Sequence, residues 1–148
     1  FTVTRTGLTE LPATFTATTA DGTASAPSDY LAALTGSTSI AAGGATGTTT
    51  LTATINGDAV VEPNETFFVG LTSPANATVA DSQGVGTITN DDTAGVTVVQ
   101  SDGNTAVTEG GATDTYTLVL TSQPTANVTV AITPNSQVTT APTSVVFT

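Results

Sequence analysis

The sequence predicts an all-β protein built from antiparallel β-sandwich modules in tandem. Three observations lead to this prediction: apolar and polar side chains alternate every two residues, β-branched threonine and valine are abundant, and turn signals recur along the chain. Alternation with one apolar face is typical of antiparallel sheets that have one buried side. Threonine and valine fit a pleated, half-buried surface. Helical apolar spacing is absent, although residues 28–34 could form one short helical turn.

The expected strands follow in chain order, and most of them are alternating segments. They are residues 1–4, 13–18, 37–40, 51–55, 66–71 and 84–89, followed by 95–100, 116–120, 128–132 and 145–147. Glycine, asparagine and aspartate cluster between these segments, and these residues favour turns. Short strands at this spacing favour a sandwich over a barrel.

An internal repeat divides the chain into two modules. Three segments near the start each parallel a segment near the end: 1–6 with 116–121, 13–19 with 127–133, and 37–40 with 144–147. We therefore expect one module over residues 1–92 and a partial second module over residues 93–148. The second module has an opening strand at 95–100 that the first lacks, and it lacks the closing strands that the first contains.

The composition excludes several kinds of chemistry. The chain has 12 acidic residues, a single basic residue (Arg5), no histidine and no cysteine, for a net charge of -11. Thiol nucleophiles, histidine-based catalysis and nucleic-acid binding are therefore excluded, and we expect no enzymatic activity. No stretch approaches the length of apolar sequence that membrane insertion needs. Carboxylates, amides and hydroxyls remain, and these groups suit a hard cation such as calcium.

Three segments of the first module carry a family resemblance. They are Asp21-Gly22-Thr23-Ala24 leading to Ser28-Asp29-Tyr30, then Glu62-Pro63-Asn64-Glu65-Thr66-Phe67, and finally Asn90-Asp91-Asp92. In this order and spacing they closely resemble the Calx-β domain, an immunoglobulin-like sandwich of sodium–calcium exchangers and large bacterial surface proteins. The resemblance implies an immunoglobulin-like fold for residues 1–92. The second module resembles part of a related surface-protein repeat.

The resemblance also implies a calcium site at one end of the sandwich. Its ligands, matched by position, would be Asp21, Asp58, Glu62, Glu65, Asn90, Asp91 and Asp92. Asp29 is not at a matched position, so Glu65 is expected to contribute more to calcium affinity than Asp29. An alternative interpretation gives the acids a purely structural role, in which Asp21 sets a turn and Glu65 accepts hydrogen bonds from backbone amides.

The expected function is that of a non-catalytic structural or adhesive repeat of a secreted bacterial surface protein. Its expected partners are copies of itself or neighbouring repeats, and a cell-surface or glycan ligand is not identified by the sequence. An alternative is a subunit of an extracellular fibre or sheath that is completed by strand pairing between chains, because open sheet edges invite such pairing. The second module keeps too few strands to cover its apolar face, so we expect it to be disordered in a free monomer unless another copy covers it.

Overall fold

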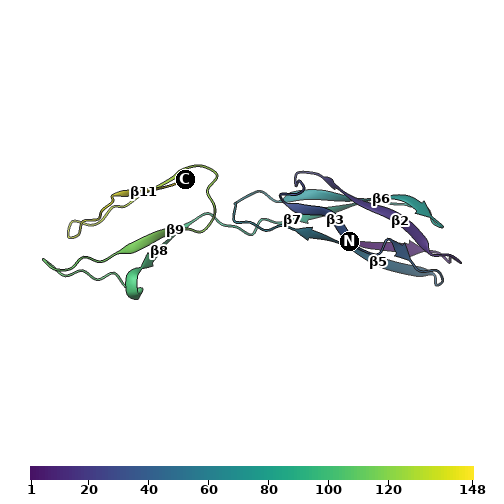
Figure 1. Ribbon diagram of the computed structural model, residues 1–148, viewed down its shortest axis with the longest axis horizontal. Helices are drawn as coiled ribbons and strands as arrows, with labels where there is room; N and C mark the ends of the chain where they lie inside the picture. Colours follow the sequence, from purple (N-terminus) through teal and green to yellow (C-terminus); the bar gives the residue numbers. More distant parts are fainter. The chain divides into compact units, whose positions relative to one another are not determined.

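The computed structural model describes all 148 residues, which form eleven β-strands and one short 3₁₀ turn, η1 (Ser101–Gly103). The chain divides into two compact units, one made of residues 1–58 and 63–90 and the other of residues 59–62 and 91–148. All strand pairs within the sheets are antiparallel, which confirms the predicted all-β class (Figure 1). The chain forms no helix with the length and apolar character needed to cross a membrane.

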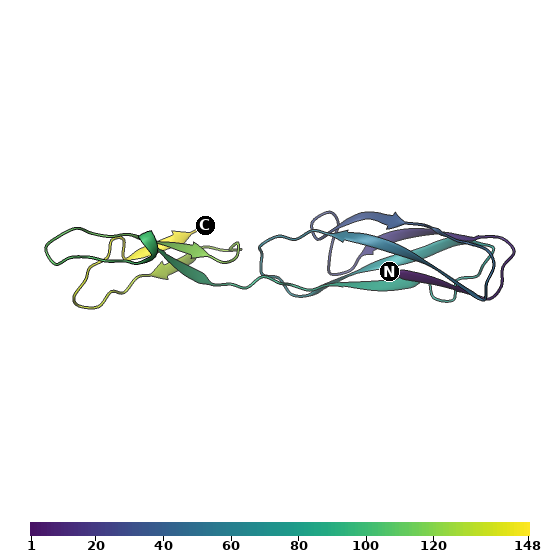
Figure 2. The same cartoon turned by 90° about the horizontal axis from the view of Figure 1, so that it is seen from below.

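The first unit is a sandwich of two sheets (Figure 2). The three-stranded sheet has the order β1-β5-β3, with β1 at Thr2–Thr6, β5 at Thr46–Ile55 and β3 at Tyr30–Gly36. The four-stranded sheet has the order β4-β2-β6-β7, with β4 at Ser39–Ile40, β2 at Ala13–Asp21, β6 at Glu65–Ala75 and β7 at Gln83–Ile88. Along β1 and β2 every second side chain turns inward, as the alternation predicts.

The sandwich core is centred on two aromatic rings. The rings of Tyr30 and Phe67 stack with centroids 4.5 Å apart, and the ring of Phe1 meets Phe67 edge-on at 5.8 Å. Leu51 and Val69 are buried beside them. Gly86 lies under this cluster, where a Cβ atom would come within 2.5 Å of the Phe67 ring. The close packing of β7 against Phe67 therefore requires glycine at this position.

The structure corrects one sequence prediction. Residues 28–34 do not form a helical turn, because β3 begins at Tyr30 and continues to Gly36. A single turn closes before the strand, where the Asp29 amide donates to the Ser25 carbonyl at 3.0 Å. The alanine- and leucine-rich segment after it pairs with β5 instead, with Tyr30 opposite Ile55. Pairing across the sheet outweighs the local preference of this segment.

The second unit consists of two separate two-stranded sheets (Figure 1). One contains β8 (Val96–Gln100) and β9 (Tyr116–Leu120), and the other contains β10 (Val128–Ala131) and β11 (Ser144–Phe147). None of residues 91–148 is buried, and every fully buried apolar side chain belongs to the first unit. The second unit therefore has strands at the predicted places but no enclosed core.

The lack of a core leads to a prediction about hydrogen exchange. Amides of β8 to β11 are expected to exchange close to the rate of an unfolded chain in a dilute monomer, because a two-stranded sheet is marginally stable in water. Amides of β2, β5 and β6 are expected to be protected for far longer. Exchange followed by mass spectrometry at low protein concentration measures the difference, and equal protection in the two units would contradict it.

Candidate metal centre

The candidate site lies at the end of the sandwich where β2 finishes and β6 begins. The register pairs Asp21, the last residue of β2, with Phe67 near the start of β6. The loop between β2 and β3 and the loop before β6 therefore meet at this end. Two backbone contacts join them: the Ala24 amide donates to the Thr66 carbonyl at 2.9 Å, and the Thr66 amide donates to the Thr23 hydroxyl at 2.8 Å. Gly22 permits this approach, since a Cβ there would lie 2.4 Å from the Thr66 oxygen.

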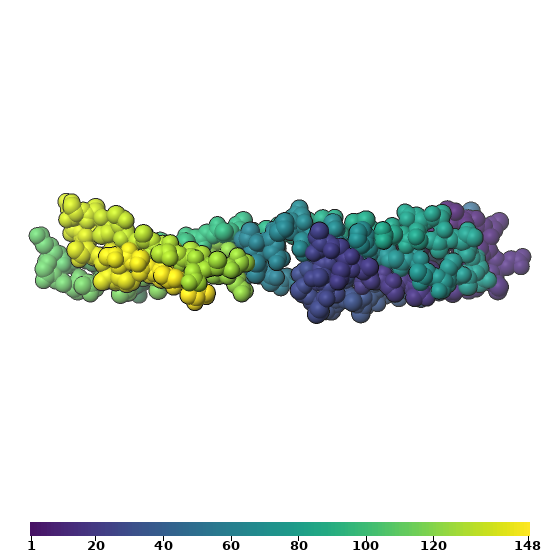
Figure 3. Space-filling view, turned by 90° about the horizontal axis from the view of Figure 1, so that it is seen from above, coloured from purple at the N-terminus to yellow at the C-terminus, as the bar shows by residue number.

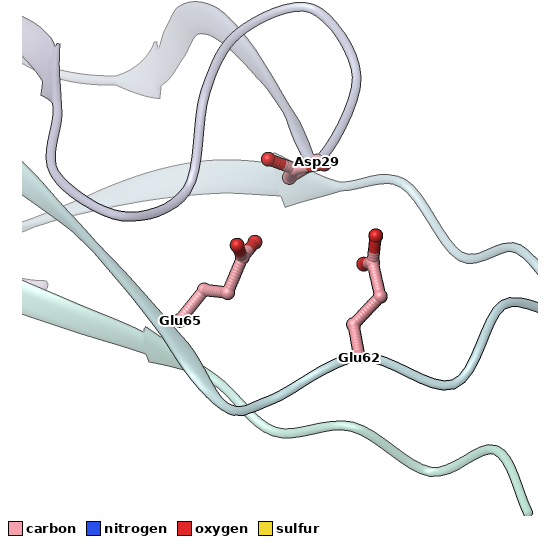
Figure 4. Close-up of side chains that lie close together, drawn as sticks. All are labelled: Asp29, Glu62 and Glu65. Atoms are coloured by element: carbon pink, nitrogen blue, oxygen red, sulfur yellow. The ribbon is translucent and has the colours of Figure 1, made fainter. Parts of the chain in front are cut away.

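Three carboxylates come together on these loops. A carboxylate oxygen of each of Asp29, Glu62 and Glu65 lies within 4.8 Å of one from each of the other two. Figure 4 shows the side chains of Glu62 and Glu65 rising from the same stretch of chain toward Asp29. Asp29 and Glu65 are partly buried, whereas Glu62 is exposed. Like charges at this separation repel one another, and a cation between them would remove the repulsion.

Asp29 is held in place by the turn that precedes it. Its Oδ2 accepts hydrogen bonds from the Ser25 amide at 2.7 Å and from the Ser25 hydroxyl at 3.3 Å. The amide bond is the main reason why the pKa of Asp29 lies below its usual value, so the group is ionised at neutral pH. Its position and charge are therefore set before any cation binds.

Asp21 holds the same loop in place through hydrogen bonds. Its Oδ1 accepts hydrogen bonds from the buried Tyr30 hydroxyl at 2.6 Å and from the Ala26 amide at 3.0 Å. The bond from Tyr30, followed by the bond from Ala26, lowers the pKa of Asp21, and the same Asp21–Tyr30 bond raises the pKa of Tyr30. Asp21 thus links the loop to the aromatic core, which agrees with the structural role that the alternative interpretation of the sequence gave it.

The structure brings together only some of the residues that the sequence assigned to calcium. Glu62 and Glu65 join the cluster of three carboxylates, whereas Asp21, Asp58, Asp91 and Asp92 are outside it. Asn90 is connected to this region by a hydrogen bond. Its backbone amide donates to the Asn64 side-chain oxygen at 3.0 Å, which links the end of the first unit to the loop between Glu62 and Glu65. The assignments of the acids outside the cluster remain predictions.

Asp29 is the member of the cluster that the sequence comparison set aside. The local sequence offered one signal for it, a serine four residues earlier that can cap the aspartate through its amide. That signal predicts a turn and says nothing about which acids the turn will face. Only the meeting of the two loops shows that Asp29 belongs with Glu62 and Glu65.

The Asp21–Tyr30 bond leads to a prediction about acid stability. Because folding lowers the pKa of Asp21 below 3.8, this bond stabilises the fold fully above that pH, and its contribution disappears as the pH falls through the folded pKa. Tyr30→Phe is therefore expected to lower the free energy of unfolding at pH 7, and the difference from the parent is expected to shrink below about pH 4. Denaturant unfolding at pH 7, 5 and 3 measures this.

The matched control for this variant is Tyr116→Phe, which removes the other tyrosine hydroxyl of the chain from a half-buried position in the second unit. It is expected to leave unfolding of the first unit unchanged at every pH. A Tyr30→Phe deficit that stays constant from pH 7 to pH 3 would show that the ionised Asp21 does not contribute through this bond.

The donor set of the cluster suits one class of ligand. Its side chains offer only carboxylate oxygens, which calcium and magnesium prefer over soft metals. Three carboxylates can supply part of a calcium shell of 6–8 oxygens, with carbonyl oxygens and water supplying the rest. The residues present therefore fit a hard divalent cation.

Comparison with known protein families gives one match. The model of the Calx-beta domain matches residues 1–102, which include the whole of the first unit and β8, and the rest of the second unit is unassigned. No curated protein and no solved structure matches the chain. Calx-beta domains commonly bind calcium and are typically non-catalytic modules of extracellular proteins. With a matching sandwich and a match over more than two thirds of its length, the chain belongs to the Calx-beta domain family.

Proposed function

We propose that this protein is a calcium-binding structural module of a secreted bacterial surface protein, in which the cation joins the loop that holds Asp29 to the segment that holds Glu62 and Glu65. The observation that carries the proposal is the cluster of Asp29, Glu62 and Glu65, whose oxygens lie within 4.8 Å of one another. The chain has a single basic side chain, Arg5, and its guanidinium bonds to the carbonyls of Gly7 and Gly43.

The positions of the ligands determine how a bound cation would stiffen the module. Asp29 belongs to the loop between β2 and β3, whereas Glu65 is the first residue of β6. A shared cation would tie these segments by charge in addition to the backbone contacts at Thr66. A module stiffened in this way suits a load-bearing repeat, and the composition, which has neither histidine nor cysteine, favours a role in support or adhesion over catalysis.

Calcium titration of the full chain tests the proposal. A ligand that binds only the folded state raises the free energy of unfolding, by about 2.7 kcal/mol when its free concentration is 100 times the dissociation constant. We expect calorimetric binding of calcium, a higher melting temperature in calcium than in chelator, and a smaller effect of magnesium, which gives up its water reluctantly. Identical melting curves in millimolar calcium and in excess chelator would leave the acids with a structural role alone.

A further inference from the structure

The asparagine that follows β5 fastens the loop between β2 and β3. The register of β3 with β5 places Asn56 opposite Asp29, and the Asn56 backbone amide donates to the Asp29 carbonyl at 3.0 Å. Its side-chain Nδ2 donates to the Pro27 carbonyl at 2.6 Å and to the Ser28 carbonyl at 3.0 Å. One residue thus bonds to three successive carbonyls of the loop.

The chemistry of these contacts fixes the orientation of the Asn56 amide. Carbonyl oxygens only accept hydrogen bonds, so the NH2 group of Asn56, and not its oxygen, must face Pro27 and Ser28. Pro27 and Ser28 are exposed, and in the space-filling view the indigo segment that contains them stands out from the surface of the first unit (Figure 3). Because these residues bury little surface of their own, this part of the loop depends on the Asn56 donor.

Asn56 is also the only asparagine of the chain that is followed by glycine. Asparagine loses its amide when the backbone nitrogen of the next residue attacks its side-chain carbonyl carbon. A side chain on that next residue hinders the attack, and glycine has none. Gly57 is exposed, and a Cβ atom built on it would meet no atom within 4 Å, so the space around it is open.

The reaction at this position needs only water. The Gly57 nitrogen forms a bond to the Asn56 Cγ, its proton passes through solvent to the Asn56 Nδ2, and Nδ2 leaves as ammonia, which produces a five-membered succinimide. Water then adds to one of the two ring carbonyls and opens the ring. Opening at one carbonyl gives aspartate, and opening at the other gives isoaspartate, in which the main chain runs through the former side chain.

We propose that Asn56 is a spontaneous deamidation site of this protein and that its deamidation releases the loop that carries Asp29. Either product replaces an NH2 donor by a carboxylate, which only accepts hydrogen bonds. The carbonyls of Pro27 and Ser28 then lose their partner and face a negative charge instead. Asp29 follows Ser28 directly and belongs to the carboxylate cluster, so the release also disturbs the candidate calcium site, an effect that rests on the proposed function.

The contacts that the reaction destroys also control its rate. While Nδ2 is bonded to both carbonyls, the side-chain amide is held away from free rotation toward the Gly57 nitrogen. Deamidation therefore requires local opening of the loop, which costs least in exposed segments with few buried contacts. We expect the folded chain to deamidate at Asn56 more slowly than the same chain unfolded in guanidinium chloride.

Peptide mapping by mass spectrometry of the full chain, incubated at mildly alkaline pH, tests the modification. We expect conversion of Asn56 to aspartate and isoaspartate while the other asparagines stay largely unmodified. Gly57→Ala is the matched control, because its methyl group hinders the attack. The structure accommodates this change, since the Cβ meets no atom and the φ angle of Gly57 is not in the left-handed region. We expect this variant to keep its Asn56 amide and its melting temperature through the same incubation.

Asn56→Asp reproduces one product and tests the consequence. It is expected to lower the melting temperature by about 4–8 °C, the shift for a net loss the size of one hydrogen bond in a small domain. Asn56→Ala removes the same donors without adding a charge and is expected to lower the melting temperature as well. Calorimetry is expected to show several-fold weaker calcium binding for both variants than for the parent, because the loop of Asp29 is no longer fastened.

Three results would overturn this inference. The first is an intact Asn56 after incubation, and the second is a Gly57→Ala variant that deamidates as fast as the parent. The third is a melting temperature equal to that of the parent for both Asn56→Asp and Asn56→Ala. None of these results depends on calcium. A parent that fails to bind calcium would refute the proposed function, while the peptide map and the melting temperatures would still decide this inference.

Discussion

Phe67→Ala is expected to lower the free energy of unfolding by about 3–5 kcal/mol, which is the largest effect of any single substitution considered for this chain. The ring is only 3% exposed and lies between two aromatic partners, stacked on Tyr30 and edge-on to Phe1. Its removal would leave a cavity at the centre of the sandwich that β7, held close by Gly86, cannot easily fill. Much of the stability of a small domain would be lost.

Phe68→Ala provides the control for this variant. It removes the same side chain from the next residue of β6, which points to the opposite face and is only half-buried. We expect a clearly smaller loss, measured by urea or thermal unfolding of both variants. Equal losses would show that the stacked cluster is not the centre of the fold.

Glu65→Gln is expected to remove most of the stabilisation that calcium confers on the parent protein. The substitution keeps the size of the side chain but replaces one of the three carboxyl groups of the cluster with a neutral amide. The melting temperature of the variant should therefore depend little on whether calcium or chelator is present. Glu10→Gln makes the same chemical change in the loop between β1 and β2, at the other end of the sandwich, and should melt like the parent in both conditions.

Asp29→Asn distinguishes the structural assignment from the one that the sequence favoured. Family positions predict that Asp29 matters less than Glu65, whereas the geometry places both carboxylates in one cluster. We expect a substantial loss of calcium affinity for Asp29→Asn as well as for Glu65→Gln, measured by calorimetry at pH 7. A normal affinity for Asp29→Asn would support the family positions over the cluster.

The Calx-beta resemblance of the first unit could be identified from sequence because its motifs are local. The Asp-Gly turn, the glutamates around the start of β6 and the alternation along β1 and β2 each occupy a few consecutive residues. The strand at Tyr30–Gly36 was missed because its alanine and leucine residues carry no two-residue alternation, and only pairing with β5 makes it a strand. Glu62 and Glu65 were predicted as ligands because they belong to a local motif. Asp29 was not predicted, because only the contact between distant segments places it beside them.

The sequence by itself determined the all-β class, the internal repeat and the acidic, cysteine-free chemistry that points to a hard cation, because these depend on composition and on spacing along the chain. The tertiary structure decided which carboxylates lie close together. Asp29 and Glu65 are far apart in the sequence, and they become neighbours only because the loop before β3 lies beside the start of β6. It also decided that Asp21 supports Tyr30. These are contacts between distant segments, and their geometry follows from sheet register and core packing, which no local pattern encodes.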